Sequence, residues 1–93
     1  MRAKIVSSVH DASLSELLGS GSIKGVVKEM GVNVRSAISC YHKSSGRFIK
    51  RTQASIDGSY SFKGLSRDYY FFIIAHHPND KFNAVIQDNV VPK

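Results

Sequence analysis

The 93 residues of the chain include only one cysteine, two prolines and no tryptophan. The stability of so small a protein therefore has to come mainly from its hydrophobic core. Because Cys40 is the only cysteine, no disulfide can form within the chain. A lone thiol favours a reducing compartment, or an assembly that does not depend on oxidation. The longest apolar run, Tyr69 to Ala75, has the length of a β-strand and cannot span a bilayer. We therefore expect no membrane segment, and the polar N-terminus is not typical of a secretory signal.

Acidic residues are also scarce, with 7 Asp and Glu against 13 Lys and Arg, which gives a formal net charge of +6. This scarcity leaves little material for a catalytic pair of carboxylates. A positive charge is compatible with nucleic acid or with another acidic surface. However, the basic residues are scattered, and only Arg47, Lys50 and Arg51 lie close together. We interpret most of them as solubilising residues on the faces and edges of strands.

Residues 1–21 differ from the rest of the chain, and we predict that they form an N-terminal arm outside the core. Asp11 or Ser13 can cap a short helix that Gly19 would end, and Gly19-Ser20-Gly21-Ser22 has the composition of a flexible linker. A helix this short is marginal in water without another surface. We expect the arm to dock on a neighbouring subunit, and the alternative is that it folds back on its own sheet. The predicted partner-binding residues are Ile5, Val6, Val9, Leu14, Leu17 and Leu18.

From residue 22 onward, apolar and polar residues alternate with a period of two, which predicts β-strands. We expect these strands near residues 23–28, 34–42, 47–54, 59–63, 69–75 and 82–91. Asp57-Gly58 is the strongest hairpin signal, and Gly46 suits a second turn, because such turns require a positive φ. The apolar run 69–75 predicts a central strand that is buried on both faces. This spacing predicts an all-β antiparallel sandwich of about seven strands over residues 22–93. Its expected buried residues include Val34, Ile38, Phe62 and Ile73.

Two stretches, GVVKEMGVNV and TQASIDGSYSFKGLSRDYYFFIIA, resemble the carboxypeptidase regulatory-like, or transthyretin-like, β-sandwich family. Asn33 stands where proline is usual in that family, and Asp68 stands where glycine is usual. The resemblance covers roughly Ile23 to Ala75 and implies a transthyretin-like or Ig-like sandwich whose motif contains no catalytic group. The matching positions are Gly25, Val27, Gly31, Val34, Thr52, Asp57, Gly58, Tyr60, Phe62, Leu65 and Tyr70.

Two further stretches, YHKSSGRFIKRT and HHPNDKFNAVIQDNVVP, resemble the subset of these domains found in tailed-bacteriophage structural proteins. This resemblance implies a non-enzymatic virion component of the tail, the head–tail connector region or a surface decoration, assembled in the host cytoplasm. Its partners would be other virion subunits, with homo-oligomers in a symmetric assembly. The alternative is an adhesion module that recognises a host cell-surface glycan or protein through its loops. The matching positions are Tyr41, Lys43, Ser45, Gly46 and Phe48 in the first stretch and Phe82, Asn83, Ala84, Val85, Ile86, Asp88, Val90 and Pro92 in the second.

Candidate catalytic and metal-binding groups are weak, and we expect no enzymatic activity, no cofactor and no metal. His76 and His77 are adjacent, and adjacent residues on a strand point to opposite faces, so we expect exposed loop histidines. Cys and His do not occur at zinc-finger spacing, and Asp57, Asp80 and Asp88 lie too far apart in sequence for a calcium loop. Cys40 and His42 would share one strand face, but nothing suggests a third, orienting group. We therefore expect Cys40 to pack in the core.

One predicted hairpin combines aromatic and basic residues, as single-strand nucleic-acid binders do. Tyr41, Lys43, Arg47 and Phe48 flank it. Most of these aromatic residues, however, fall at alternating positions that a core or a face contacting a partner would explain. We therefore expect nucleic acid to be an unlikely partner.

Overall fold

The computed structural model describes residues 13–29, 32–33, 36–76 and 83–93, and in these residues the chain is mostly β-structure. All strand pairings between them are antiparallel, which confirms the predicted all-β antiparallel fold. Val34 and Gly31 lie outside the described residues. The elements are α2 (Leu14–Leu17), β1 (Leu18–Val26), β2 (Lys28–Glu29), β3 (Val32–Asn33), β4 (Ala37–His42), β5 (Phe48–Gln53), β6 (Ser59–Leu65), β7 (Phe71–His76) and β8 (Asn83–Val90).

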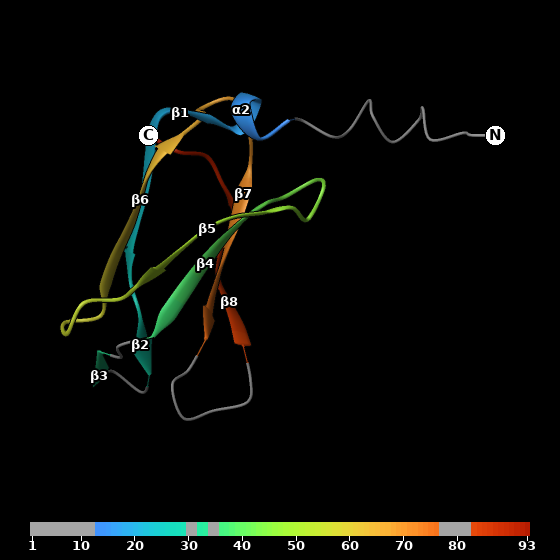
Figure 1. Cartoon of the computed structure of the whole chain (residues 1–93). Coiled ribbons are helices and arrows are strands. Elements are labelled where there is room, and N and C mark those ends of the chain that lie inside the picture. The colour runs from blue at the N-terminus through green and yellow to red at the C-terminus, as the bar shows by residue number, and fades with distance from the viewer. Residues whose placement is uncertain (1–12, 30–31, 34–35, 77–82) are drawn as a thin grey trace.

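The strands form two main sheets that share one hydrophobic cluster. Strand β1 pairs with β6, and the larger sheet has the order β5-β4-β7-β8, while β2 and β3 form a small separate ladder. Figure 1 shows β1 beside β6 and, on the opposite side, β7 beside β8, with β4 and β5 running diagonally across the body. Both sheets contribute buried residues to the cluster: Ile23, Tyr60, Phe62 and Leu65 from β1 and β6, and Ile38, Cys40, Phe71, Ile73 and Ala75 from β4 and β7.

Strand β7 lies between β4 and β8, as the prediction of a central strand requires. The prediction that it is buried on both faces is wrong. Phe71 and Ile73 are fully buried, whereas Phe72 and Ile74 are only half-buried. Alternate side chains of a strand point to opposite faces, and only one face of β7 meets the shared cluster. The apolar residues of the other face therefore belong to an outward surface.

The two predicted turns adopt the expected backbone conformation, with φ of 72° at Gly46 and 83° at Gly58. The turn between β5 and β6 is held by Asp57, whose Oδ1 accepts hydrogen bonds from the backbone N–H of Ser59 at 3.0 Å and from its hydroxyl at 2.7 Å. These hydrogen bonds from Ser59 lower the pKa of Asp57. The turn at Asp57-Gly58 connects the two sheets, because β5 pairs with β4 and β6 pairs with β1, so the prediction of a hairpin at this turn is wrong.

The structure differs from the predicted arm over residues 13–21. Ser13 caps α2 as expected, but Leu17 has no exposed surface, and its carbonyl accepts a hydrogen bond from the backbone N–H of Ser66 at 2.9 Å. The predicted linker forms part of β1. A Cβ on Gly21 would stand 2.6 Å from Cβ of Pro92, so this glycine permits close packing. Residues 13–21 therefore fold back on the chain's own sheet, which was the alternative to docking on a neighbouring subunit. Residues 1–12 lie outside the described residues.

Candidate functional site

The outward face of the four-stranded sheet carries a group of aromatic rings. Tyr41 on β4 and Phe72 on β7 are direct cross-strand partners. Their rings are stacked, with centroids 5.1 Å apart and planes at 9°. Tyr41 also meets Phe48 of β5 edge-on, with centroids 5.6 Å apart. These three neighbouring strands thus present one continuous set of rings on the face opposite the core.

A fourth ring, Tyr70, directly precedes β7 and is connected to the same region through the backbone. Its carbonyl accepts a hydrogen bond from the backbone N–H of Lys43 at 2.9 Å. Tyr70 is 57% exposed, and Phe48 is 51% exposed, whereas Tyr41 and Phe72 are half-buried between their neighbours. We call Tyr41, Phe48, Tyr70 and Phe72 the outer aromatic surface. Its two most exposed rings come from β5 and from the residue before β7.

Basic side chains accompany the outer aromatic surface. The Nζ of Lys43 lies 5.9 Å from the centroid of Phe72 and 2.7 Å from Oδ1 of Asp88. The hydrogen bond from Lys43 is the main reason that the pKa of Asp88 is lowered. Arg51 is the cross-strand partner of Ser39, and the exposed Arg47 precedes Phe48. The surface therefore combines rings with the cations of Lys43 and Arg51, and the carboxylate of Asp88 is bound by Lys43.

On the same sheet, three side chains are arranged in the order of a nucleophile, a base and an orienting group. The Oγ of Ser39 lies 2.9 Å from Nε2 of His76, and Nδ1 of His76 lies 2.9 Å from Oδ1 of Asn83. Sequence reasoning missed this set because the residues come from three strands. Ser39 is only 1% exposed. Its strand also pairs on both sides, so the ladder engages the backbone N–H groups that would stabilise an oxyanion. The arrangement joins β4, β7 and β8 without offering a reachable nucleophile.

The predicted core position of Cys40 is confirmed, since its side chain is completely buried. Burial raises the pKa of the Cys40 thiol to about 12, despite the opposing effect of the Lys50 charge. Only the thiolate is nucleophilic, so Cys40 is chemically inert in the folded chain. His42 ends β4, is 3% exposed, and its Nδ1 lies 2.7 Å from Oγ of Ser45. The expectation of an exposed loop histidine is wrong for His76, which ends β7 and is half-buried.

Metal-binding geometry is not found in the described part of the chain. His76 is the last residue of β7 and is half-buried, whereas His77 and Asp80 lie outside the described residues. Within residues 13–29, 32–33, 36–76 and 83–93, no group of three or more His, Cys, Asp or Glu side chains could hold a metal ion. Asp57 and Asp88, two of the three aspartates considered as calcium ligands, are instead hydrogen-bonded to Ser59 and Lys43, respectively.

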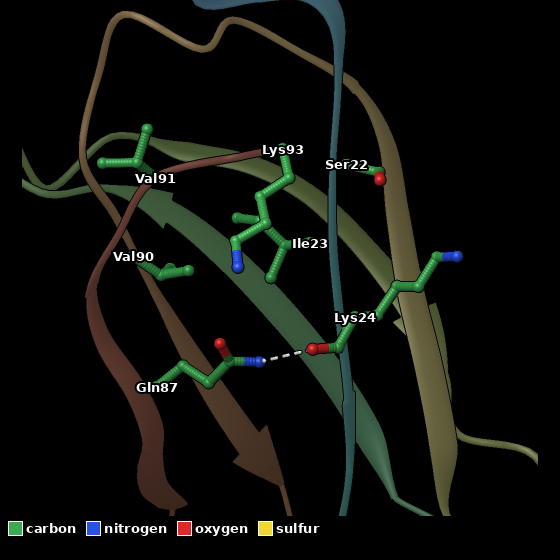
Figure 2. A pocket seen from close by; sticks show the side chains of 7 residues that line it. All are labelled: Ser22, Ile23, Lys24, Gln87, Val90, Val91 and Lys93. Atoms are coloured by element: carbon green, nitrogen blue, oxygen red, sulfur yellow. Dashed lines mark hydrogen bonds between the residues drawn. The ribbon is translucent and has the colours of Figure 1, made fainter.

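A groove of about 440 Å³ runs between β1 and β8, and Figure 2 shows the side chains that line it. Gln87 spans it, because its Nε2 donates to the carbonyl of Lys24 at 3.0 Å and to the hydroxyl of Tyr60 at 2.5 Å. Ser22 and Lys93 also join their backbones through two hydrogen bonds of 2.9 Å. The groove is thus bridged by the chain itself, and we interpret it as the seam between the two sheets.

The predicted partner-binding leucines are divided by the structure. Leu17 belongs to the interior and is unavailable to a partner, whereas Leu14 and Leu18 are each 41% exposed. Leu14 is the first residue of α2, and Leu18 directly follows the helix. The other predicted partner-binding residues, Ile5, Val6 and Val9, lie outside the described residues.

No protein-family model, curated protein or solved structure matches this chain. In the described ranges, no helix combines the length and the apolar character needed to cross a membrane. What the chain does must therefore be inferred from its own residues and their geometry.

Proposed function

We propose that the chain is a non-enzymatic structural component of a tailed-bacteriophage virion, in the tail, the head–tail connector region or a surface decoration. One observation carries this proposal. The two sequence elements that resemble phage structural proteins lie far apart in the chain, and they meet where Lys43 of the first forms a 2.7 Å ion pair with Asp88 of the second. The pair connects the β4–β5 hairpin to the last strand. The two stretches would then form one composite surface rather than two unrelated motifs.

The finer fold assignment, a transthyretin-like β-sandwich, belongs to the same proposal. It is supported by the two sheets that enclose one hydrophobic cluster and by the turn at Asp57-Gly58. Three positions of the family pattern, Tyr60, Phe62 and Leu65, are buried in that cluster. The groups with catalytic potential, Ser39 and Cys40, are also buried, which supports a structural role over an enzymatic one.

Assembly would use the end of the molecule where α2 lies. Leu14 and Leu18 expose apolar surface there, next to a segment whose predicted partner-binding residues are Ile5, Val6 and Val9. Burying such surface against a neighbouring subunit is favourable, at about 25 cal/mol per Å² of apolar area. We expect symmetric copies of the chain to meet other virion subunits through this end.

The test compares incorporation of variants into particles. Leu14→Asp and Leu18→Asp should leave the fold intact and reduce the amount of chain recovered in purified particles. The matched control is Ile56→Asp, because Ile56 is an exposed apolar residue, 85% exposed, on the β5–β6 turn. Equal incorporation of all three variants would contradict assembly through the α2 end.

A further inference from the structure

The aromatic residues of the β4–β5 hairpin are not part of the core. A core position was one of the two explanations that made nucleic acid an unlikely partner, and it does not apply to these rings. Tyr41 and Phe72 alternate with core residues, so their rings lie on the outward face. Phe48 and Tyr70 expose more than half of their surface. What remains to be explained is an exposed set of rings beside Lys43 and Arg51 in a chain of net charge +6.

We propose that the outer aromatic surface binds single-stranded nucleic acid, with bases stacked on its exposed rings and phosphates held by the neighbouring cations. The inference is independent of the virion assignment. Proteins that bind single strands without sequence preference combine basic side chains that follow the backbone with aromatic rings that stack on bases. Here the rings succeed one another across β7, β4 and β5 at centroid separations of 5.1 and 5.6 Å.

A single strand fits this surface better than other anionic partners. Each nucleotide supplies both a phosphate and a flat aromatic face, which matches cations interleaved with rings. In a duplex the base faces are stacked on each other and cannot reach Phe48 or Tyr70. An acidic protein surface would also engage the cations, and a comparison with polyglutamate separates that partner from a single strand. A second copy of the chain would bring the same cations against one another.

The experiment measures fluorescence anisotropy of a fluorescein-labelled 15-mer of deoxythymidine with the full chain at 25, 100 and 200 mM salt. We expect saturable binding that weakens steadily with salt, because phosphate contacts release counterions. A duplex of the same length should bind more weakly. Phe48→Ala should weaken binding of the 15-mer roughly 5- to 100-fold, as the loss of one stacked base predicts.

Two matched controls separate the site from general charge and from loss of folding. Ile56→Ala also removes an exposed apolar side chain, but from the β5–β6 turn, and should leave the affinity unchanged. Arg51→Gln on the outward face should weaken binding more than Lys63→Gln on β6, although both remove one positive charge. Circular dichroism spectra should show that every variant remains folded.

Four results would overturn the proposal. These are absence of binding at 25 mM salt, equal affinity for duplex and single strand, a Phe48→Ala affinity equal to that of the unaltered chain, and equal losses for Arg51→Gln and Lys63→Gln. Binding of polyglutamate as tightly as the 15-mer, with no effect of Phe48→Ala, would assign the surface to acidic protein partners and would likewise overturn it.

Discussion

The α-carbon of Gly25 lies directly against the phenol of Tyr60. A Cβ at position 25 would stand 2.6 Å from Cζ of that ring and 2.8 Å from Nε2 of Gln87. The ring is held in place, because Gln87 donates a hydrogen bond to its hydroxyl. Gln87 belongs to β8, while Gly25 and Tyr60 are cross-strand partners in β1 and β6. The absence of a side chain at position 25 therefore lets one amide connect the two sheets.

This contact predicts that Gly25→Ala is destabilising. The methyl group has to displace the Tyr60 ring or the Gln87 amide, and such overpacking typically costs about 1–3 kcal/mol. Urea denaturation would measure the loss. In a Tyr60→Ala background the same substitution should cost less, because the clashing ring is gone. Strictly additive effects of the two substitutions would show that the contact does not limit position 25.

The alternation of β7 predicts unequal effects at two adjacent isoleucines. Ile73 is completely buried in the shared cluster, so Ile73→Ala should cost roughly 2–5 kcal/mol, whereas Ile74→Ala removes the same atoms from the half-buried outward face and should cost clearly less. The two free energies of unfolding, measured in urea, test the orientation of the sheet directly. A larger loss at Ile74 than at Ile73 would mean that the faces are reversed.

The period-two pattern was sufficient to locate the main strands and to place Ile38 on the same strand face as Cys40. It could not separate Ile73 from Phe72, because the run 69–75 is apolar throughout and predicted burial on both faces. It failed where composition suggested flexibility. Gly19 and Gly21 occur in a linker-like stretch, yet Gly21 packs against Pro92 at the far end of the chain. Local sequence contains no signal for such a distant contact.

The same limitation applies to the candidate sites. Sequence placed Tyr41, Lys43 and Phe48 around one hairpin, but the contribution of Phe72 and Tyr70 depends on how β7 aligns with β4. The set formed by Ser39, His76 and Asn83 likewise arises only from the register of three strands. The period of the pattern predicts which residues of one strand share a face. It does not predict which residue of a neighbouring strand lies beside them.

Stability should fall at alkaline pH because of Cys40. Its pKa is raised from 9.0 to about 12 in the folded chain, so the contribution of the neutral thiol is present below pH 9 and is lost as the pH rises toward 12. Burial also raises the pKa of Tyr60, which acts in the same direction. The difference between the urea unfolding midpoints at pH 8 and pH 10.5 should be smaller in Cys40→Ala than in the unaltered chain. An unchanged difference, or rapid reaction of the native thiol with a disulfide reagent at pH 8, would contradict the burial of Cys40.

The leucines around α2 should separate folding from assembly. Leu17→Ala should destabilise the isolated chain by roughly 2–5 kcal/mol, because the side chain is completely buried. Leu14→Ala, at a 41% exposed position, should change the stability by no more than about 0.5 kcal/mol. Thermal and urea unfolding of both variants provide the comparison. Similar losses for both would indicate that Leu14 is also packed inside.

The ion pair between Lys43 and Asp88 should be visible in the titration of the aspartate. Because the pKa of Asp88 is lowered, its contribution to stability is present above about pH 3.8 and is lost as the pH falls through the folded value. Lys43→Gln should raise the pKa of Asp88 in a carboxyl NMR titration. Asp57, which is bound by Ser59, provides the control and should titrate as before. An unchanged Asp88 titration would show that the pair does not persist in solution.

We propose that this chain is a built-in component of a phage particle. The most direct measurement is quantitative mass spectrometry of gradient-purified particles from the culture that produces the chain, with peptides of a known capsid or tail protein as the internal standard. We predict a fixed number of copies per particle that matches a symmetric position, unchanged by repeated gradient purification. Absence of the chain from particles, or an amount that declines with each purification, would contradict the claim.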